Sequence, residues 1–302
     1  MSNAFALLPD FLLIVVGFLL CRCTPLDRTV WDGAERLVYY VLFPVLLFNS
    51  IVRQPLEPGT LASLGLVGLV VVGTGVVLAY ALARWPGVDA RAHASGAQCA
   101  FRFNSYIALA LAERLGGAAG VAAAAVLVSL AVPLCNVAAV WPLARHGGHG
   151  YARELLRNPL ILATVAGLAA NLLGLKLPEP IAITTQRIGL AALPIGLMAV
   201  GAGLRFGALR DAPGLAAALL AIRHAVLPAL AVALVLASQL TTVQQMVVVM
   251  FAALPTASSA YVLAARMGGH GAYVSGLVTV STLLGMVSVP LALAAWQALA
   301  QR

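Results

Sequence analysis

The hydrophobic and polar positions of this chain are arranged in long blocks. Apolar stretches of about 20 residues, the length of a helix that crosses a bilayer, follow one another from end to end and are separated by short polar turns. Residues 58–83, 115–144 and 225–265 contain no Asp, Glu, Lys or Arg, and the last of these is long enough for two spans. The pattern predicts ten membrane helices, near residues 4–22, 34–53, 60–83, 92–113, 118–144, 158–175, 184–205, 213–237, 242–267 and 272–299.

The second half of the chain repeats the first with a shift of 150 to 152 residues. LLPDFLLIVVGFLL recurs as RNPLILATVAGLAA, so that Pro9 and Gly17 are matched by Pro159 and Gly167. LFPVLLF recurs as LPIGLMA, and AERLGG recurs as AARMGG, in the same order. Two homologous membrane halves are a common build of secondary transporters, whose substrate site lies where the halves meet.

The repeat and the number of spans together predict the domain organisation. Ten spans divide into five per copy, and an odd number of spans per copy places the two copies in opposite orientations. We therefore expect an all-α integral membrane protein made of two inverted five-helix repeats, residues 1–150 and 151–302.

Composition and charge agree with a membrane protein and indicate its orientation. Apolar residues make up 62% of the chain and charged residues 9%, against about 25% charged residues in soluble domains. Loops after odd-numbered spans hold eleven Lys and Arg, and the termini and remaining loops hold five. By the positive-inside rule the odd loops are cytoplasmic and both termini lie outside the inner membrane. The net charge of +8 mostly reflects this bias, so no nucleic-acid partner is expected. The four cysteines have no metal-binding spacing, and no cofactor is predicted.

Two predicted spans, the fourth and the ninth, contain polar interruptions at matching places in the two halves. The residues concerned are Arg102, Asn104 and Ser105 in span 4, and Pro255, Thr256, Ser258 and Ser259 in span 9. A proline inside a helix removes a backbone hydrogen bond, and backbone groups freed at membrane depth must be satisfied by protein, water or substrate. Broken helices at equivalent points of two halves indicate a transporter's binding site.

The interruptions suggest an anion site. Asn104 and Ser105 would begin one half-helix, and Thr256, Ser258 and Ser259 the other, so that two positive helix ends converge. Arg102 would add a full charge, whose burial at a helix centre costs about 2.5–3.5 kcal/mol on insertion scales. The alternatives are that Pro255 only kinks an intact helix, that the serines serve packing, and that Arg102 snorkels or pairs with a structural carbonyl.

Further polar residues lie in other spans. Asn136 in span 5 is a candidate for the same site, and Arg223 and His224 in span 8 form either a structural tether or a proton relay. All ten carboxylates fall near span ends or in loops, whereas sodium and proton couplers commonly keep one at depth. Coupling is then absent, runs through His224, or uses the substrate's own protonation.

These residues carry a family resemblance. FPVLLFNSIV, RFNSYIALALAERLGG, RNPLILATVAGL, ALPIGLMAVGAGL and LPTASSAYVLAARMGG occur in the order seen in the auxin efflux carrier family. That family includes bacterial carriers of small organic acids and the plant PIN-type auxin exporters. The resemblance implies broken helices 4 and 9 that cross, a scaffold of helices 1, 2, 6 and 7, a transport domain of helices 3–5 and 8–10, an elevator-type mechanism and a homodimer.

The resemblance also assigns residues. Asn104 matches the asparagine of helix 4, Pro255 the crossing proline of helix 9, and Pro44 the proline of helix 2. Two positions depart from many relatives: Ala110 stands near a helix 4 proline, which predicts a milder break there, and Ser259 stands in place of an asparagine.

Together these observations predict a secondary carrier of small organic anions. Auxin-like monocarboxylates and malonate- or malate-like dicarboxylates both fit, with Asn104 and Ser259 as hydrogen-bonding groups and Arg102 as the attracting charge. The alternatives are a sodium-coupled symporter of the bile-acid type and a non-transporting membrane sensor. A membrane enzyme is not expected, because the chain has no H-E-x-x-H motif, aspartate-rich pair or recognisable Ser–His–Asp arrangement.

Overall fold

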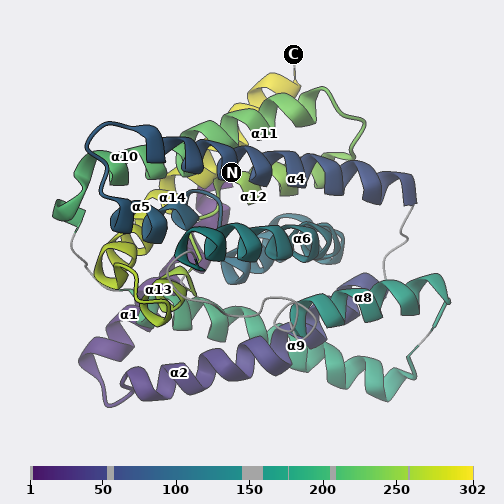
Figure 1. The fold of residues 1–302 in the computed structure, drawn as a ribbon. Coiled ribbons are helices and arrows are strands. Elements are labelled where there is room, and N and C mark those ends of the chain that lie inside the picture. The colour runs from purple at the N-terminus through teal and green to yellow at the C-terminus, as the bar shows by residue number, and fades with distance from the viewer. Residues whose placement is uncertain are drawn as a thin grey trace. The chain divides into compact units, whose positions relative to one another are not determined.

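The computed structural model describes residues 3–52, 58–144, 159–175, 177–204, 209–257 and 259–301, and every regular element in these ranges is a helix (Figure 1). The first half contains α1 (Asn3–Cys23), α2 (Arg28–Leu37), η1 (Val38–Leu42), α3 (Phe43–Val52), α4 (Pro58–Ala81), η2 (Leu82–Arg84), α5 (Ala90–Gly96), η3 (Ala97–Ala100) and α6 (Ser105–Ala144). The second half contains α8 (Pro159–Leu172), α9 (Glu179–Ala202), η4 (Leu209–Asp211), α10 (Pro213–Ala221), η5 (Ile222–Val226), α11 (Leu227–Leu236), α12 (Thr242–Ala253), α13 (Ser259–Arg266) and α14 (Gly271–Ala300).

Each predicted span falls on one or more of these helices. Five helical stretches in the described part of the chain are long and apolar enough to cross a membrane: Ala62–Arg84, Ala90–Leu143, Glu179–Ala202, Pro213–Leu236 and Gly271–Ala300. The stretch from Ala90 to Leu143 covers predicted spans 4 and 5, and Gly117 interrupts it with φ of 54°, a left-handed conformation that glycine adopts readily. The predicted domain boundary near residue 150 lies outside the described residues.

The helices group into two compact units. Unit 1 consists of residues 1–64, 106–129 and 151–203, and unit 2 of residues 65–105, 130–150 and 204–302.

Within unit 1, the packing of α1 on α9 depends on glycines. A Cβ atom on Gly17 would lie 1.9 Å from the backbone oxygen of Met198, and one on Gly201 would lie 1.8 Å from the backbone oxygen of Ile14. Small residues at such points let membrane helices approach closely. In the same unit α3 contacts α8, and Asn171 Nδ2 donates to the Val52 carbonyl across a distance of 3.1 Å.

Within unit 2, α14 runs uninterrupted for 30 residues. The segment α10–α11 carries a π-helical turn at Ile222–Val226, a feature frequent at functional sites. Predicted spans 4 and 9 are both broken, at 101–104 and at 254–257.

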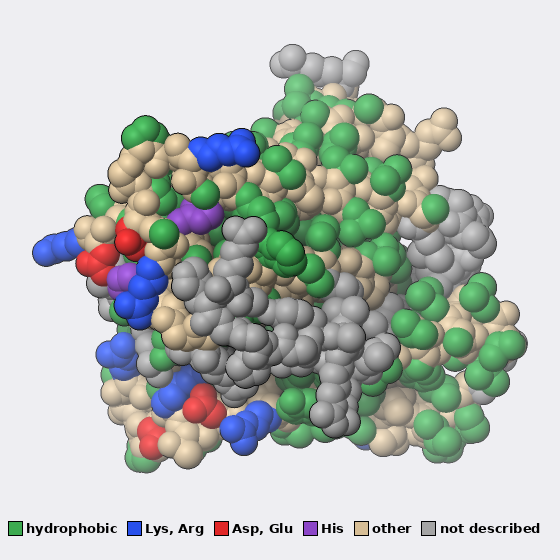
Figure 2. Space-filling view, viewed as in Figure 1, with side chains coloured by type: hydrophobic (Ala, Val, Ile, Leu, Met, Phe, Trp, Pro, Cys, Tyr) green, Lys and Arg blue, Asp and Glu red, His purple; other side chains and the backbone are tan. Residues whose placement is uncertain are grey.

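The surface of the described residues is strongly apolar. On the face in Figure 2, hydrophobic side chains cover much of the described surface and charged side chains are few. Leu66 and Val77 of α4 and Val287 and Leu291 of α14 are among the large side chains that are more than half exposed. Such surfaces suit helices that face lipid.

Candidate functional site

Both predicted interruptions are complete breaks in the helical backbone, and both lie in unit 2. In span 4 helical structure stops at Ala100 and α6 begins at Ser105. In span 9, α12 stops at Ala253 and α13 begins at Ser259. Pro255 therefore ends a helix and does not merely kink it. The prediction that Thr256 begins the second half-helix is wrong, because Thr256 lies in the non-helical segment; Ser258 lies outside the described residues.

The break in span 4 forms without a proline. The sequence predicted a milder break because Ala110 stands near the position of a family proline, but residues 101–104 leave the helix completely. Instead of a proline, contacts from other segments hold the extended backbone. Cys135 Sγ lies 3.5 Å from the Phe101 carbonyl, and the Asn104 amide donates to the Pro255 carbonyl across 2.9 Å. Tertiary hydrogen bonds thus substitute for the missing helical ones.

The two breaks are joined directly to each other. Besides the bond from Asn104 to Pro255, the Thr256 hydroxyl donates to the Cys99 carbonyl across 2.7 Å. Asn104 and Thr256 are both buried, with 3% and 0% of their surface exposed. Two segments about 150 residues apart therefore share one polar core at the level of their breaks.

Arg102 lies at this junction and contacts three neutral side chains. Its guanidinium donates to Gln98 Oε1 at 3.0 Å, to Asn136 Oδ1 at 3.3 Å and to Ser259 Oγ at 3.2 Å. Ser259 is exposed and is the first residue of α13, so the guanidinium lies beside a helix N-terminus. A cation at a helix N-terminus is unfavourable, and a bound anion would relieve both positive charges.

The structure thus brings together most of the predicted site residues. Arg102 contacts Asn136 and Ser259. Asn104 and Thr256 form the bonds between the two breaks, and Ser105 and Pro255 are their neighbours in the chain. Unit 2 contains nine arginines and two carboxylates, Asp89 and Asp211, and two of these arginines, Arg102 and Arg223, lie within predicted spans away from their ends.

Arg223 contacts the end of α12. The side chain is fully buried, and it donates from Nε to the Leu254 carbonyl and from Nη2, across 3.0 Å, to the Phe251 carbonyl. The last carbonyls of a helix have no intrahelical partner and carry partial negative charge. The sequence left two alternatives for Arg223, a structural tether and a proton relay. Its contacts with α12 are those of a tether.

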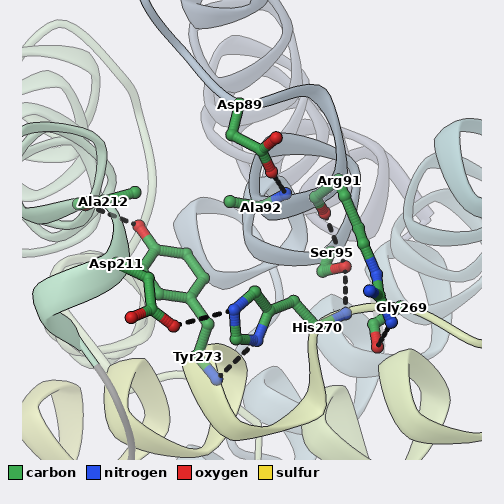
Figure 3. Close-up of polar contacts among 9 residues, drawn as sticks. All are labelled: Asp89, Arg91, Ala92, Ser95, Asp211, Ala212, Gly269, His270 and Tyr273. Atoms are coloured by element: carbon green, nitrogen blue, oxygen red, sulfur yellow. Dashed lines mark hydrogen bonds and ion pairs between the residues drawn. The ribbon is translucent and has the colours of Figure 1, made fainter.

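A second polar cluster within unit 2 joins residues from several helices and loops (Figure 3). His270 Nε2 lies 2.9 Å from the Asp211 carboxylate, and His270 Nδ1 accepts from the Tyr273 amide at 3.3 Å. Ser95 Oγ accepts from the His270 amide at 2.7 Å, and Arg91 donates to the Gly268 carbonyl at 3.2 Å. These contacts bring together the loops after predicted spans 3, 7 and 9. The Lys and Arg count had placed those three loops on one side of the membrane.

Comparisons with known proteins indicate a membrane transporter. Residues 148–293 match the model of a family described as membrane transport protein. The chain is 29% identical to a protein of Rhizobium meliloti (strain 1021) named "Putative malonate transporter", over 93% of this chain and 92% of that protein. It is 25% identical to an "Uncharacterized transporter" of Methanothermobacter thermautotrophicus (strain ATCC 29096 / DSM 1053 / JCM 10044 / NBRC 100330 / Delta H), over 96% and 97%.

The second half of the chain is similar to this membrane transport protein family, and both relatives, matched over nearly the whole chain, carry transporter names. The matches confirm the resemblance to the auxin efflux carrier family and identify a multi-pass membrane protein that moves a small molecule, not an enzyme.

Sequence reasoning missed two sets of residues in this transporter. Gln98 is buried, and its Nε2 donates to the Ser95 and Ala260 carbonyls while its Oε1 accepts from Arg102. The sequence feature that could have indicated Gln98 is its spacing of four residues from Arg102, because residues four apart lie on one face of a helix. The second set is formed by Ser281 and Ser288 of α14, whose spacing of seven residues also places them on one face.

Proposed function

We propose that this transporter is a secondary carrier of small organic anions in the inner membrane. The observation that carries the proposal is the position of Arg102, whose guanidinium contacts neutral groups beside the first residue of α13 at the junction of two broken spans. A carboxylate is the complementary ligand, because it pairs with a guanidinium and with the amides of a helix N-terminus.

The residues have separate roles in this proposal. Arg102 supplies the attracting charge, and Asn104 and Ser259 supply hydrogen bonds to the anion. Asn136 orients Arg102, and Thr256 holds the two breaks together. Ser105 and Ser258 remain predicted neighbours of the ligand. The name of the Rhizobium meliloti relative favours malonate-like dicarboxylates over auxin-like monocarboxylates.

The finer architecture is part of the same proposal. Ten spans form two inverted five-helix repeats, and unit 2 moves relative to unit 1 in an elevator-type cycle. The grouping of predicted spans 1, 2, 6 and 7 in unit 1 supports this division, although residues 106–129 also fall in that unit. Both termini lie outside the cytoplasm, which is consistent with the meeting of three odd-numbered loops (Figure 3). A homodimer follows from the family resemblance.

A binding screen tests the proposal. Purified protein is heated with increasing malonate or with an aromatic monocarboxylate, because a ligand of the folded state stabilises it by RT ln(1 + [L]/Kd). Stabilisation by malonate that is lost in Arg102→Gln is the expected result. Arg91→Gln is the matched control, since Arg91 contacts backbone carbonyls. Equal stabilisation of both variants would remove Arg102 from the site.

Flux measurements separate the carrier from its alternatives. Proteoliposomes that contain the transporter should take up radiolabelled malonate without a requirement for sodium. Uptake that depends on sodium would favour a symporter of the bile-acid type. Binding without uptake would favour a membrane sensor.

A further inference from the structure

A chain of hydrogen bonds crosses the break in span 9 and passes through His224. On one side the Ser288 hydroxyl donates to the carbonyl of Ala253, the last residue of α12, at 3.2 Å. On the other side the Thr256 amide donates to Ser281 Oγ at 2.9 Å. The His224 ring joins the two serines, with 2.8 Å from Nδ1 to Ser288 Oγ and 2.8 Å from Nε2 to Ser281 Oγ.

The Ala253 end of this chain fixes a proton on His224 Nδ1, and a neutral ring then leaves Nε2 as an acceptor. The Thr256 amide can only donate, so it uses one of the two lone pairs of Ser281 Oγ, and the Ser281 hydroxyl can donate to His224 Nε2. The Ala253 carbonyl can only accept, so the Ser288 hydroxyl proton is directed to it and Ser288 Oγ accepts the proton of His224 Nδ1. Every donor then has one acceptor when the imidazole is neutral and carries its proton on Nδ1.

A second proton on the ring does not fit this arrangement. Nε2–H would donate to Ser281 Oγ, and the Ser281 hydroxyl proton would lose its acceptor in the chain. The neighbouring guanidinium of Arg223 is buried and opposes another positive charge. The elements packed most closely against His224, namely α10, α11, α12, α14 and η3, contain no Asp or Glu. Their other titratable side chains are Cys99 of η3 and Tyr273 of α14.

The face of α14 that carries Ser281 and Ser288 packs directly against the break in span 9. Ser281, Gly285 and Ser288 are spaced as i, i+4 and i+7, so they lie on one face of the helix. A Cβ atom on Gly285 would approach Pro255 Cδ to 3.0 Å, closer than most contacts of real Cβ atoms. The helix backbone and the broken segment therefore lie in direct contact, which keeps the bonds through His224 short.

The bridge leads to the proposed anion site. Thr256 also donates to the Cys99 carbonyl, and three residues later Ser259 begins α13 and accepts from Arg102. A shift of Thr256 would consequently move the start of α13 relative to Arg102. We infer that His224 is a positioning residue that holds the break as a neutral imidazole and is not a proton relay, an inference that rests on the proposed anion-binding function.

The charge state is tested by nuclear magnetic resonance of protein labelled with ¹⁵N-histidine, with the His224→Asn variant used to assign the signal. The expected result is a neutral ring protonated on Nδ1 that does not change between about pH 5.5 and 8, where an unperturbed imidazole titrates. A signal that titrates in this range, or a ring protonated on Nε2, would overturn the inference whether or not the protein transports malonate.

The positioning role is tested by malonate binding and uptake. Ser281→Ala and His224→Ala should each raise the Kd for malonate by about two- to tenfold, the scale of one lost hydrogen bond. The double variant should be no weaker than the weaker single variant. The pH profile of uptake should stay as in the wild type. Thr282→Val is the control, because its hydroxyl bonds within α14, to the Val278 carbonyl.

Each outcome has a defined meaning. A Kd in Ser281→Ala equal to that of Thr282→Val overturns the positioning role, as do additive losses in the double variant or a pH profile that changes in His224→Ala. If His224→Ala does not fold, Ser281→Ala and the tautomer of the wild type still decide the question. A wild-type protein that binds no carboxylate overturns the proposed function, and the anion-positioning role with it.

Discussion

Replacing Arg223 by methionine should destabilise the transporter more than replacing any other described arginine that contacts backbone carbonyls. The guanidinium is fully buried and donates to the carbonyls of Phe251 and Leu254 at the end of α12. Arg223→Met leaves both carbonyls buried without this donor, at about 1–3 kcal/mol each. Recovering the desolvation cost of the buried charge offsets part of that loss. We therefore expect a net loss of about 1–4 kcal/mol in the free energy of unfolding.

The chain offers a matched control for this measurement. Arg91 also donates to two carbonyls beyond a helix end, those of Gly268 and Gly269, but these contacts are exposed. Arg91→Met should change stability by no more than about 0.5 kcal/mol, as is usual for surface substitutions. Both variants are compared with the wild type by denaturant titration of purified protein in detergent, followed by circular dichroism. Equal midpoints for the two variants would refute the tether, because a buried and an exposed contact would then contribute the same.

Three further substitutions have defined outcomes. Gly17→Ala places a Cβ atom 1.9 Å from a backbone oxygen of α9 and should sharply lower the yield of folded protein. Gly73→Ala is the control, because a Cβ atom there meets open space. Similar melting curves for the two variants would contradict the close packing. Asn104→Ala should abolish malonate uptake while the protein still elutes as a folded species, and unchanged uptake would remove it from the site. Asp211→Asn removes the carboxylate that contacts His270 in a partly exposed position, so we expect a loss of less than about 1 kcal/mol in thermal unfolding. A loss several times larger would indicate a buried role.

The sequence predicted the positions of both breaks because their signals are local. Pro255 removes a helical hydrogen bond, and the polar run from Arg102 to Ser105 interrupts an otherwise apolar span. The repeat added information, since an offset of 152 residues aligned the two interruptions. The candidates around Arg102 followed from the same argument, and the structure places Asn136 and Ser259 against its guanidinium.

Other features depend on contacts that hydropathy does not contain. The bond between His224 and Ser281 joins residues 57 positions apart, and serines in an apolar span are usually read as packing residues. The start of α13 at Ser259 instead of Thr256 has the same origin, because the Thr256 amide and hydroxyl are both used by other segments. A complete break in span 4 without a proline also depends on partners from elsewhere, such as Cys135.

The hydrogen bonds described above at the two breaks begin and end within unit 2. A displacement of that unit through the bilayer would carry each peptide group together with its partner. The irregular backbone would therefore stay in contact with protein and would not become exposed to hydrocarbon during such a movement. A bare peptide group costs several kcal/mol in lipid, and this cost would not contribute to the barrier between inward-facing and outward-facing states.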